Sequence, residues 1–89
     1  MRTMASIRST IISQIKQIAR EHSKKLAPLT DDLSLLESGL DSLAFAVLVA
    51  RLEEALGYDP FTESKEVYYP TTLGDFIRFY EKYEPARGV

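Results

Sequence analysis

The sequence contains no cysteine, no tryptophan and a single histidine, His22. Without cysteine the chain can form neither disulfides nor thiolate metal sites, and it cannot supply a thiol nucleophile of its own. A serine triad would have to use His22, and nothing in its spacing indicates this. The acidic loop residues Asp31, Asp32, Asp59 and Glu63 are expected to be solvated or to cap helices. We therefore expect no catalytic residue and no metal site.

Long hydrophobic runs are also missing. The longest apolar run, Leu43–Ala50, is far shorter than the roughly 18 residues that a membrane span needs. The N-terminus has no continuous apolar segment of the kind found in signal peptides. These absences predict a cytoplasmic protein without a membrane span.

The length and composition predict one small globular domain over residues 1–89, with an ordered core over about 4–84. Of the 89 residues, 45% are hydrophobic and 27% are charged, which favours a globular chain over a disordered one. Residues 1–28 hold six basic residues and one acidic residue, whereas the remainder is acidic. Such a basic segment could attract nucleic acid or anionic lipid. A solvated helix face beside an acidic remainder is favoured, because the cations alternate with isoleucines, and no nucleic-acid partner is expected.

Apolar spacing predicts a first helix of about 18 residues that ends between Ser23 and Pro28. Its stripe is formed by Met4, Ile7, Ile11, Ile15 and Ile18. Residues 28–41 form a long loop, which in so small a domain is usually functional. Within it, Ser34 and Glu37 fit a capping box. Gly39 permits a close backbone approach. The expected anchors of this loop to the core are Leu33, Leu36 and Leu40.

Three further helices are predicted. One runs from Asp41 or Ser42 to Leu56 and stops at Gly57, and a short one lies around 62–69. The last is capped by Thr72 with Asp75 and is ended by Pro85. Its stripe is Leu73, Phe76, Ile77 and Tyr80. No strand-period alternation is present, so the fold class is all-α: a small four-helix bundle with three main helices and one short helix.

The helix over 42–56 is apolar all round in its first half. One stripe, expected to face the core, consists of Phe45, Leu48, Val49, Leu52 and Leu56. The opposite side carries Leu43, Ala46, Val47 and Ala50. Either another part of the chain buries this second side, or it is an exposed patch. Exposed apolar patches commonly mark partner surfaces, and so small a domain has little spare chain for burial. The partner-binding interpretation is favoured.

Asp41 and Ser42 stand at the head of this patch. Both residue types are ordinary helix caps. Alternatively, Asp41 caps the helix and the Ser42 hydroxyl points outward, where the positive end of the helix would favour a phosphate ester. The dipeptide alone favours simple capping.

The surrounding sequence adds a resemblance. The motif "GLDSL" at 39–43, after the long loop and at the start of a second helix, resembles the phosphopantetheine attachment motif of acyl and peptidyl carrier proteins. "LTDDLSLLESGLDSL" resembles the loop that precedes the modified serine, "RLEEALG" the end of the family's second helix, and "YYPTTLGDF" the start of its last helix. The resemblance covers nearly the whole chain.

This resemblance implies a carrier and not an enzyme. A phosphopantetheinyl transferase would attach 4'-phosphopantetheine from coenzyme A to Ser42, beside Asp41, which would assist that metal-dependent step. An acyl- or aminoacyl-activating ligase would load the arm with a thioester, and a downstream acyl transferase or synthase would receive it. Leu43, Ala46, Val47 and Ala50 match the face that carriers turn toward their partners.

Two departures favour a specialised or peptidyl-type carrier over the general fatty-acid carrier. Ala44 and Val47 are apolar where fatty-acid carriers are acidic, and the first helix is basic. A discrete monomer that acts in trans in a dedicated pathway is expected. Tyr68 and Tyr69 either flank the arm or belong to the core and its rim. The alternative function is a non-enzymatic helical interaction domain that uses the apolar face of the second helix.

Overall fold

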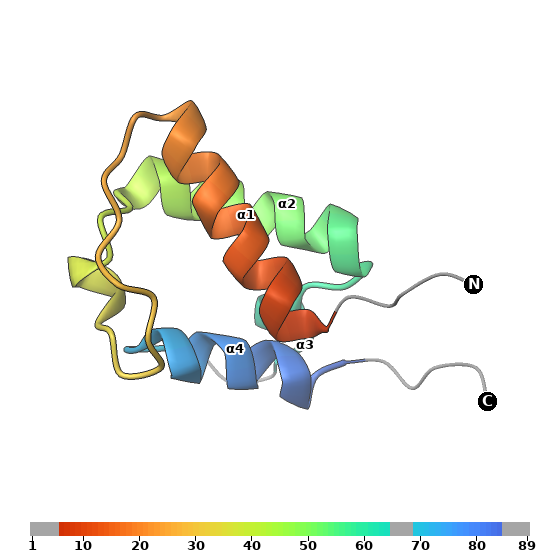
Figure 1. The fold of residues 1–89 in the computed structure, drawn as a ribbon. Coiled ribbons are helices and arrows are strands. Elements are labelled where there is room, and N and C mark those ends of the chain that lie inside the picture. Colours follow the sequence, from red (N-terminus) through yellow and green to blue (C-terminus); the bar gives the residue numbers. More distant parts are fainter. Residues whose placement is uncertain (1–5, 65–68, 85–89) are drawn as a thin grey trace.

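The computed structural model describes residues 6–64 and 69–84, shown in colour in Figure 1. The described elements follow in the order α1 (Ile7–Glu21), the 3-10 turn η1 (Leu35–Glu37), α2 (Ser42–Leu56), α3 (Pro60–Glu63) and α4 (Leu73–Lys82). Helix α1 packs against both α2 and α4. The loop after α1 passes η1 before it reaches α2 (Figure 1). This confirms the predicted all-α bundle. Within the described part, no helix has the length and apolar character to cross a membrane.

Helix α1 follows the predicted isoleucine stripe. It begins where the Ser6 hydroxyl accepts the backbone N–H of Ser9 at 3.0 Å. It ends at Glu21, and Ser23 then takes a positive φ of 56°, which breaks the helical path before Pro28. Its buried face consists of Ile7, Ile11, Ile15, Ile18 and Ala19. The expected first member of the stripe, Met4, lies outside the described residues.

The predicted anchors in the loop are partly wrong. Leu36 is 94% exposed, while Leu35 packs against the core in its place. The reason is a β-bridge between Ser34 and Thr72, next to which the Leu35 N–H donates to the Thr71 carbonyl at 2.9 Å. This pairing fixes the direction of the backbone at Ser34, which turns Leu35 inward and Leu36 outward. The Ser34 side chain makes no capping hydrogen bond, so the predicted capping box is absent.

Leu40 packs against the core as predicted, and Leu33 is half-buried. The short third helix is displaced from its predicted range of 62–69. It begins at Pro60, because Asp59 caps it by accepting the Phe61 N–H at 2.9 Å, and it ends at Glu63. Residues 65–68 of the predicted range lie outside the described residues.

The core-facing side of α2 is rotated relative to the prediction. Its fully buried residues are Ala44, Leu48 and Leu52. Three of the five residues assigned to the core stripe are only partly buried, namely Phe45, Val49 and Leu56. Val47, expected on the far side, is also partly buried and packs against the core. Leu43, Ala46 and Ala50 are exposed, as expected of the far side.

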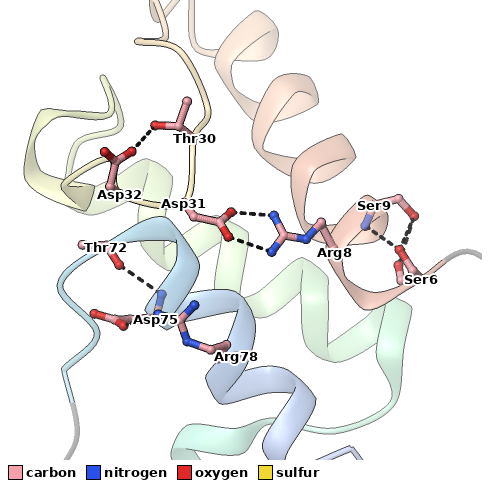
Figure 2. A network of polar contacts seen from close by, with 9 residues as sticks. All are labelled: Ser6, Arg8, Ser9, Thr30, Asp31, Asp32, Thr72, Asp75 and Arg78. Carbon is pink, nitrogen blue, oxygen red and sulfur yellow. Dashed lines mark hydrogen bonds and ion pairs between the residues drawn. The ribbon is translucent and has the colours of Figure 1, made fainter.

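Helix α4 begins and packs as predicted. The Thr72 hydroxyl accepts the Asp75 N–H at 3.1 Å, and Arg78 donates to the Asp75 carboxylate at 2.7 Å (Figure 2). The predicted stripe is fully buried, and Phe76 stacks at an angle on Phe45 of α2 with ring centroids 5.3 Å apart. The helix ends at Lys82, and Pro85 lies outside the described residues.

Candidate functional site

Ser42 is the first residue of α2, and its side chain is exposed. The residue before it, Asp41, caps the helix by accepting the Ala44 N–H at 2.8 Å. No hydrogen bond from a described residue engages the Ser42 hydroxyl. Of the two interpretations of this dipeptide, the structure therefore has Asp41 as the cap and Ser42 pointing to solvent. The hydroxyl lies at the positive end of a 15-residue helix, where negative charge is favoured.

The Asp41 carboxylate has a second partner, Lys24, which follows the end of α1. The Lys24 ammonium lies 2.7 Å from the other carboxylate oxygen. Its hydrogen bond, followed by that of the Ala44 N–H, lowers the pKa of Asp41 below its ordinary value of 3.8. A full negative charge therefore lies next to Ser42 at neutral pH, and an ammonium group balances it.

Contacts between the segment that follows α1 and the end of the loop fix the backbone that leads into Ser42. The Ala27 N–H donates to the Ser38 carbonyl at 3.0 Å. Gly39 adopts a φ of 106°, and a Cβ there would overlap the Lys25 carbonyl oxygen. Ser38 is only 3% exposed, and its hydroxyl donates to the Leu35 carbonyl at 2.8 Å. The close approach predicted for Gly39 is confirmed.

The other end of the loop is held against α1 and α4. Arg8 of α1 forms two hydrogen bonds to Asp31, at 2.6 and 3.1 Å (Figure 2). The Leu73 N–H donates to the Leu33 carbonyl at 2.9 Å. Arg8 and Lys24 of the basic segment are thus paired with acidic loop residues, as expected for a helix beside an acidic remainder.

A groove of about 560 Å³ opens beside Ser42. Its lining comes from the loop, the start of α2 and the segment before α4, and consists of Leu35, Leu36, Leu40, Asp41, Ser42, Phe45, Tyr69, Pro70 and Thr71. Tyr69 is 81% exposed, so it belongs to the lining of this groove and not to the core. Tyr68 lies outside the described residues.

Two contributors to this site were not predicted from the sequence. Lys24 carries no local signal for its role, because its partner Asp41 lies on the far side of the loop. Ser38 was also missed, although a small polar residue directly before a glycine is a common turn signal.

The acidic loop residues have partners within the chain. Asp31 pairs with Arg8, Asp32 accepts a hydrogen bond from Thr30 at 2.7 Å, and Asp59 caps α3.

Comparison with known proteins identifies the family of the chain. Residues 13–64 match the family model described as "Phosphopantetheine attachment site", which spans more than half of the chain and includes Ser42. The chain belongs to the phosphopantetheine attachment-site family. Its structure is similar to that of MacpD, an acyl carrier protein from Pseudomonas fluorescens involved in mupirocin biosynthesis. The TM-score is 0.73 and the identity 25%, over 93% of this chain and 75% of that chain. Comparison with curated protein sequences gave no match.

The protein is therefore a carrier with the acyl carrier fold, and its cofactor is covalently attached 4'-phosphopantetheine. Acyl carrier proteins of this kind are not enzymes. The predicted resemblance is confirmed, and family membership favours the carrier function over the simple interaction domain. The residues at the start of α2 fit the cofactor, because an exposed hydroxyl, a helix N-terminus and an adjacent groove lie together there.

Proposed function

We propose that Ser42 bears the phosphopantetheine arm, and that the carrier presents acyl or aminoacyl thioesters to the enzymes of a dedicated biosynthetic or modification pathway. The observation that carries this proposal is the exposed Ser42 hydroxyl at the start of α2, with Asp41 as the helix cap. The other serines of the loop are less accessible. Ser38 is buried and its hydroxyl donates to the Leu35 carbonyl, and Ser34 is half-buried, with its backbone in the bridge to Thr72.

The Ser42 hydroxyl is the nucleophile in the loading reaction. Its oxygen forms a bond to the phosphorus that bears pantetheine in coenzyme A, while the pyrophosphate P–O bond breaks and 3',5'-ADP leaves. The hydroxyl proton passes to a base of the transferase. Once attached, the arm supplies the thiol that this cysteine-free chain lacks. Leu40, Phe45 and Pro70 in the groove would flank the arm where it leaves Ser42.

We further propose that the exposed side of α2 is the surface that partners contact. Leu43 is 66% exposed, and Ala46 and Ala50 continue this face along the helix. Val47 contributes only its exposed part, since it also packs against the core. The partners are a phosphopantetheinyl transferase, an acyl- or aminoacyl-activating ligase and a downstream acyl transferase or synthase.

The attachment site is tested by intact mass after incubation with coenzyme A, magnesium and a broad-specificity phosphopantetheinyl transferase. We expect one phosphopantetheinyl increment on the wild type and none on Ser42→Ala, which keeps the Asp41 cap and therefore the fold. Ser13→Ala, which removes an exposed hydroxyl from α1, should be modified like the wild type. An increment on Ser42→Ala would refute attachment at Ser42.

The partner face is tested with substitutions on one helix. Ala46→Glu and Ala50→Glu should slow transfer to or from the cognate enzymes while they leave the melting temperature nearly unchanged. The matched control is Ala55→Glu, an exposed alanine at the other end of α2. These positions are better probes than Val47, because a charge there would also disturb the core. Equal transfer rates in all three variants would refute the proposed face.

A further inference from the structure

Three large apolar side chains are exposed in the part of the chain that the structure describes, namely Leu36, Leu43 and Tyr69. Leu43 belongs to the proposed partner face of α2, whereas the other two side chains lie outside it. Leu36 is 94% exposed and Tyr69 is 81% exposed, and both line the groove beside Ser42. We call these two side chains the groove rim. Exposed apolar side chains that lie together commonly mark a binding surface, and this pair shares a groove with the attachment residue.

The backbone fixes the exposure of the groove rim. The Leu35 N–H donates to the Thr71 carbonyl at 2.9 Å, and Ser34 forms a β-bridge with Thr72. These contacts join η1 to the segment before α4, turn Leu35 toward the core and leave Leu36 outside. The two segments that carry the rim are therefore held together before any arm is attached, and the groove is preformed.

The groove offers apolar surface and no free charge. Asp41 is the one charged residue among those that line it. Both oxygens of this carboxylate are engaged, one by the Ala44 N–H and the other by the Lys24 ammonium. An uncharged, apolar group is therefore the occupant that this lining fits.

The covalent structure of the arm decides which of its groups lies at the groove. Directly beyond the phosphate comes the pantoyl unit, whose quaternary carbon bears a pair of methyl groups. Only a few bonds separate this carbon from the Ser42 oxygen, so it stays within about 6 Å of that oxygen. The amides of the arm lie further along and need hydrogen-bond partners. The lining offers few of these, because apart from Ser42 and the engaged Asp41 only Tyr69 and Thr71 have polar side-chain atoms. The methyl pair therefore fits the groove, and the amides are better solvated outside it.

We propose that the groove rim, Leu36 and Tyr69, binds the methyl pair of the pantoyl unit and thereby anchors the base of the arm. This inference rests on the proposed attachment at Ser42, and it specifies which part of the arm the chain itself binds. Burial of the methyl pair favours the anchored arm over the free arm by roughly tenfold. An advantage of this size holds the base of the arm at the groove, and a partner enzyme that binds the pantoyl unit more tightly can still remove it.

The test is nuclear magnetic resonance of the loaded carrier, prepared with isotope-labelled coenzyme A and brought to complete loading as judged by intact mass. In the wild type we expect nuclear Overhauser contacts from the pantoyl methyls to the Tyr69 ring and to the Leu36 methyls. The pantoyl methyl resonances should also shift from their positions in free coenzyme A, because aromatic rings lie beside them. The double variant Leu36→Ser with Tyr69→Ser should lose these contacts, and its pantoyl resonances should return toward those of coenzyme A. Both replaced side chains are exposed, so the fold should be kept, and the melting temperature checks this.

Leu43→Ser is the matched control. It also removes an exposed leucine close to Ser42 but leaves the lining of the groove unchanged, so the pantoyl contacts should equal those of the wild type. Pantoyl resonances in the loaded wild type that match free coenzyme A would overturn the inference and leave attachment at Ser42 intact. Undiminished contacts in the double variant would do the same. Absence of any mass increment on the wild type would overturn the proposed attachment as well.

Discussion

Two of the described glycines have positive φ angles, and together they allow the close approach before Ser42 to be tested quantitatively. Gly57 ends α2 with a φ of 85°, and a Cβ there would meet no atom within 4 Å. Gly57→Ala therefore carries only the strain of a left-handed alanine, about 1 kcal/mol. Gly39 has a φ of 106°, and its Cβ would also overlap a backbone carbonyl that cannot rotate away.

We expect Gly39→Ala to lower the free energy of unfolding by about 3 kcal/mol or more, since strain and displaced backbone add together. A domain of this length has a total stability of about 4 to 13 kcal/mol, so the loss is large. Urea unfolding followed by circular dichroism at 222 nm measures both variants, and Gly57→Ala is the matched control for the change in composition and φ.

The same two variants separate an effect on stability from an effect on the position of Ser42. At a temperature where both variants are folded, Gly39→Ala should load coenzyme A more slowly than Gly57→Ala, because the clash moves the segment that leads into Ser42. If Gly39→Ala is no less stable than Gly57→Ala, then the contact between Lys25 and Gly39 does not hold this segment in solution.

Three further predictions concern the core and the paired carboxylates. The Tyr80 hydroxyl is buried without a partner among the described residues, so Tyr80→Phe should leave stability unchanged or raise it. Tyr58→Phe, which loses the 2.6 Å bond to the Tyr80 carbonyl, should cost about 1 to 3 kcal/mol; equal urea midpoints would contradict this. Leu48→Ala should lower the free energy of unfolding by about 2 to 5 kcal/mol and Leu43→Ala by less than about 0.5 kcal/mol, since Leu48 is fully buried and Leu43 is 66% exposed. Similar losses in the two variants would refute the orientation of α2. The third prediction concerns pH. Four of the described carboxylates have pKa values that are lowered chiefly by hydrogen bonds from basic side chains. Their contribution to the stability of the folded state is therefore present above the ordinary carboxyl pKa and is lost as the pH falls through the folded-state pKa. They are Glu21, Asp31, Asp41 and Asp75. The melting temperature should decrease once the pH is lowered below about 4. A melting temperature that stays constant between about pH 5 and pH 3 would contradict these ion pairs.

The helices were predictable where local rules decide the structure. The isoleucines of α1 and the stripe of α4 recur at helical spacing, and the caps at Thr72 and Asp41 depend on residues within one turn. Leu36 could not be placed in this way. Its exposure follows from the bridge between Ser34 and Thr72, which joins segments that are distant in sequence and leaves no periodic pattern.

The same distinction between local rules and distant contacts holds for the residues of the site. Ser42 was predictable because motif and helix start coincide, whereas the Lys24 partner of Asp41 depends on how the end of α1 packs against the end of the loop. Tertiary structure also changes the interpretation of Ala44. Its lack of charge is one of the two departures from the fatty-acid carriers, and the residue is completely buried beside Leu48. An acidic side chain there would have to leave this core, so an apolar residue suits the packing of α2 in this chain.

Under the proposed function, the exposed side of α2 is the surface that partners recognise. Leu43, Ala46 and Ala50 are exposed and uncharged, and they follow Ser42 along one side of the helix. A face of this kind gives little long-range electrostatic attraction, so partners would recognise it through short-range apolar contact. Docking to this face should accordingly depend weakly on salt, and a steep salt dependence of the transfer rate would contradict recognition by apolar contact.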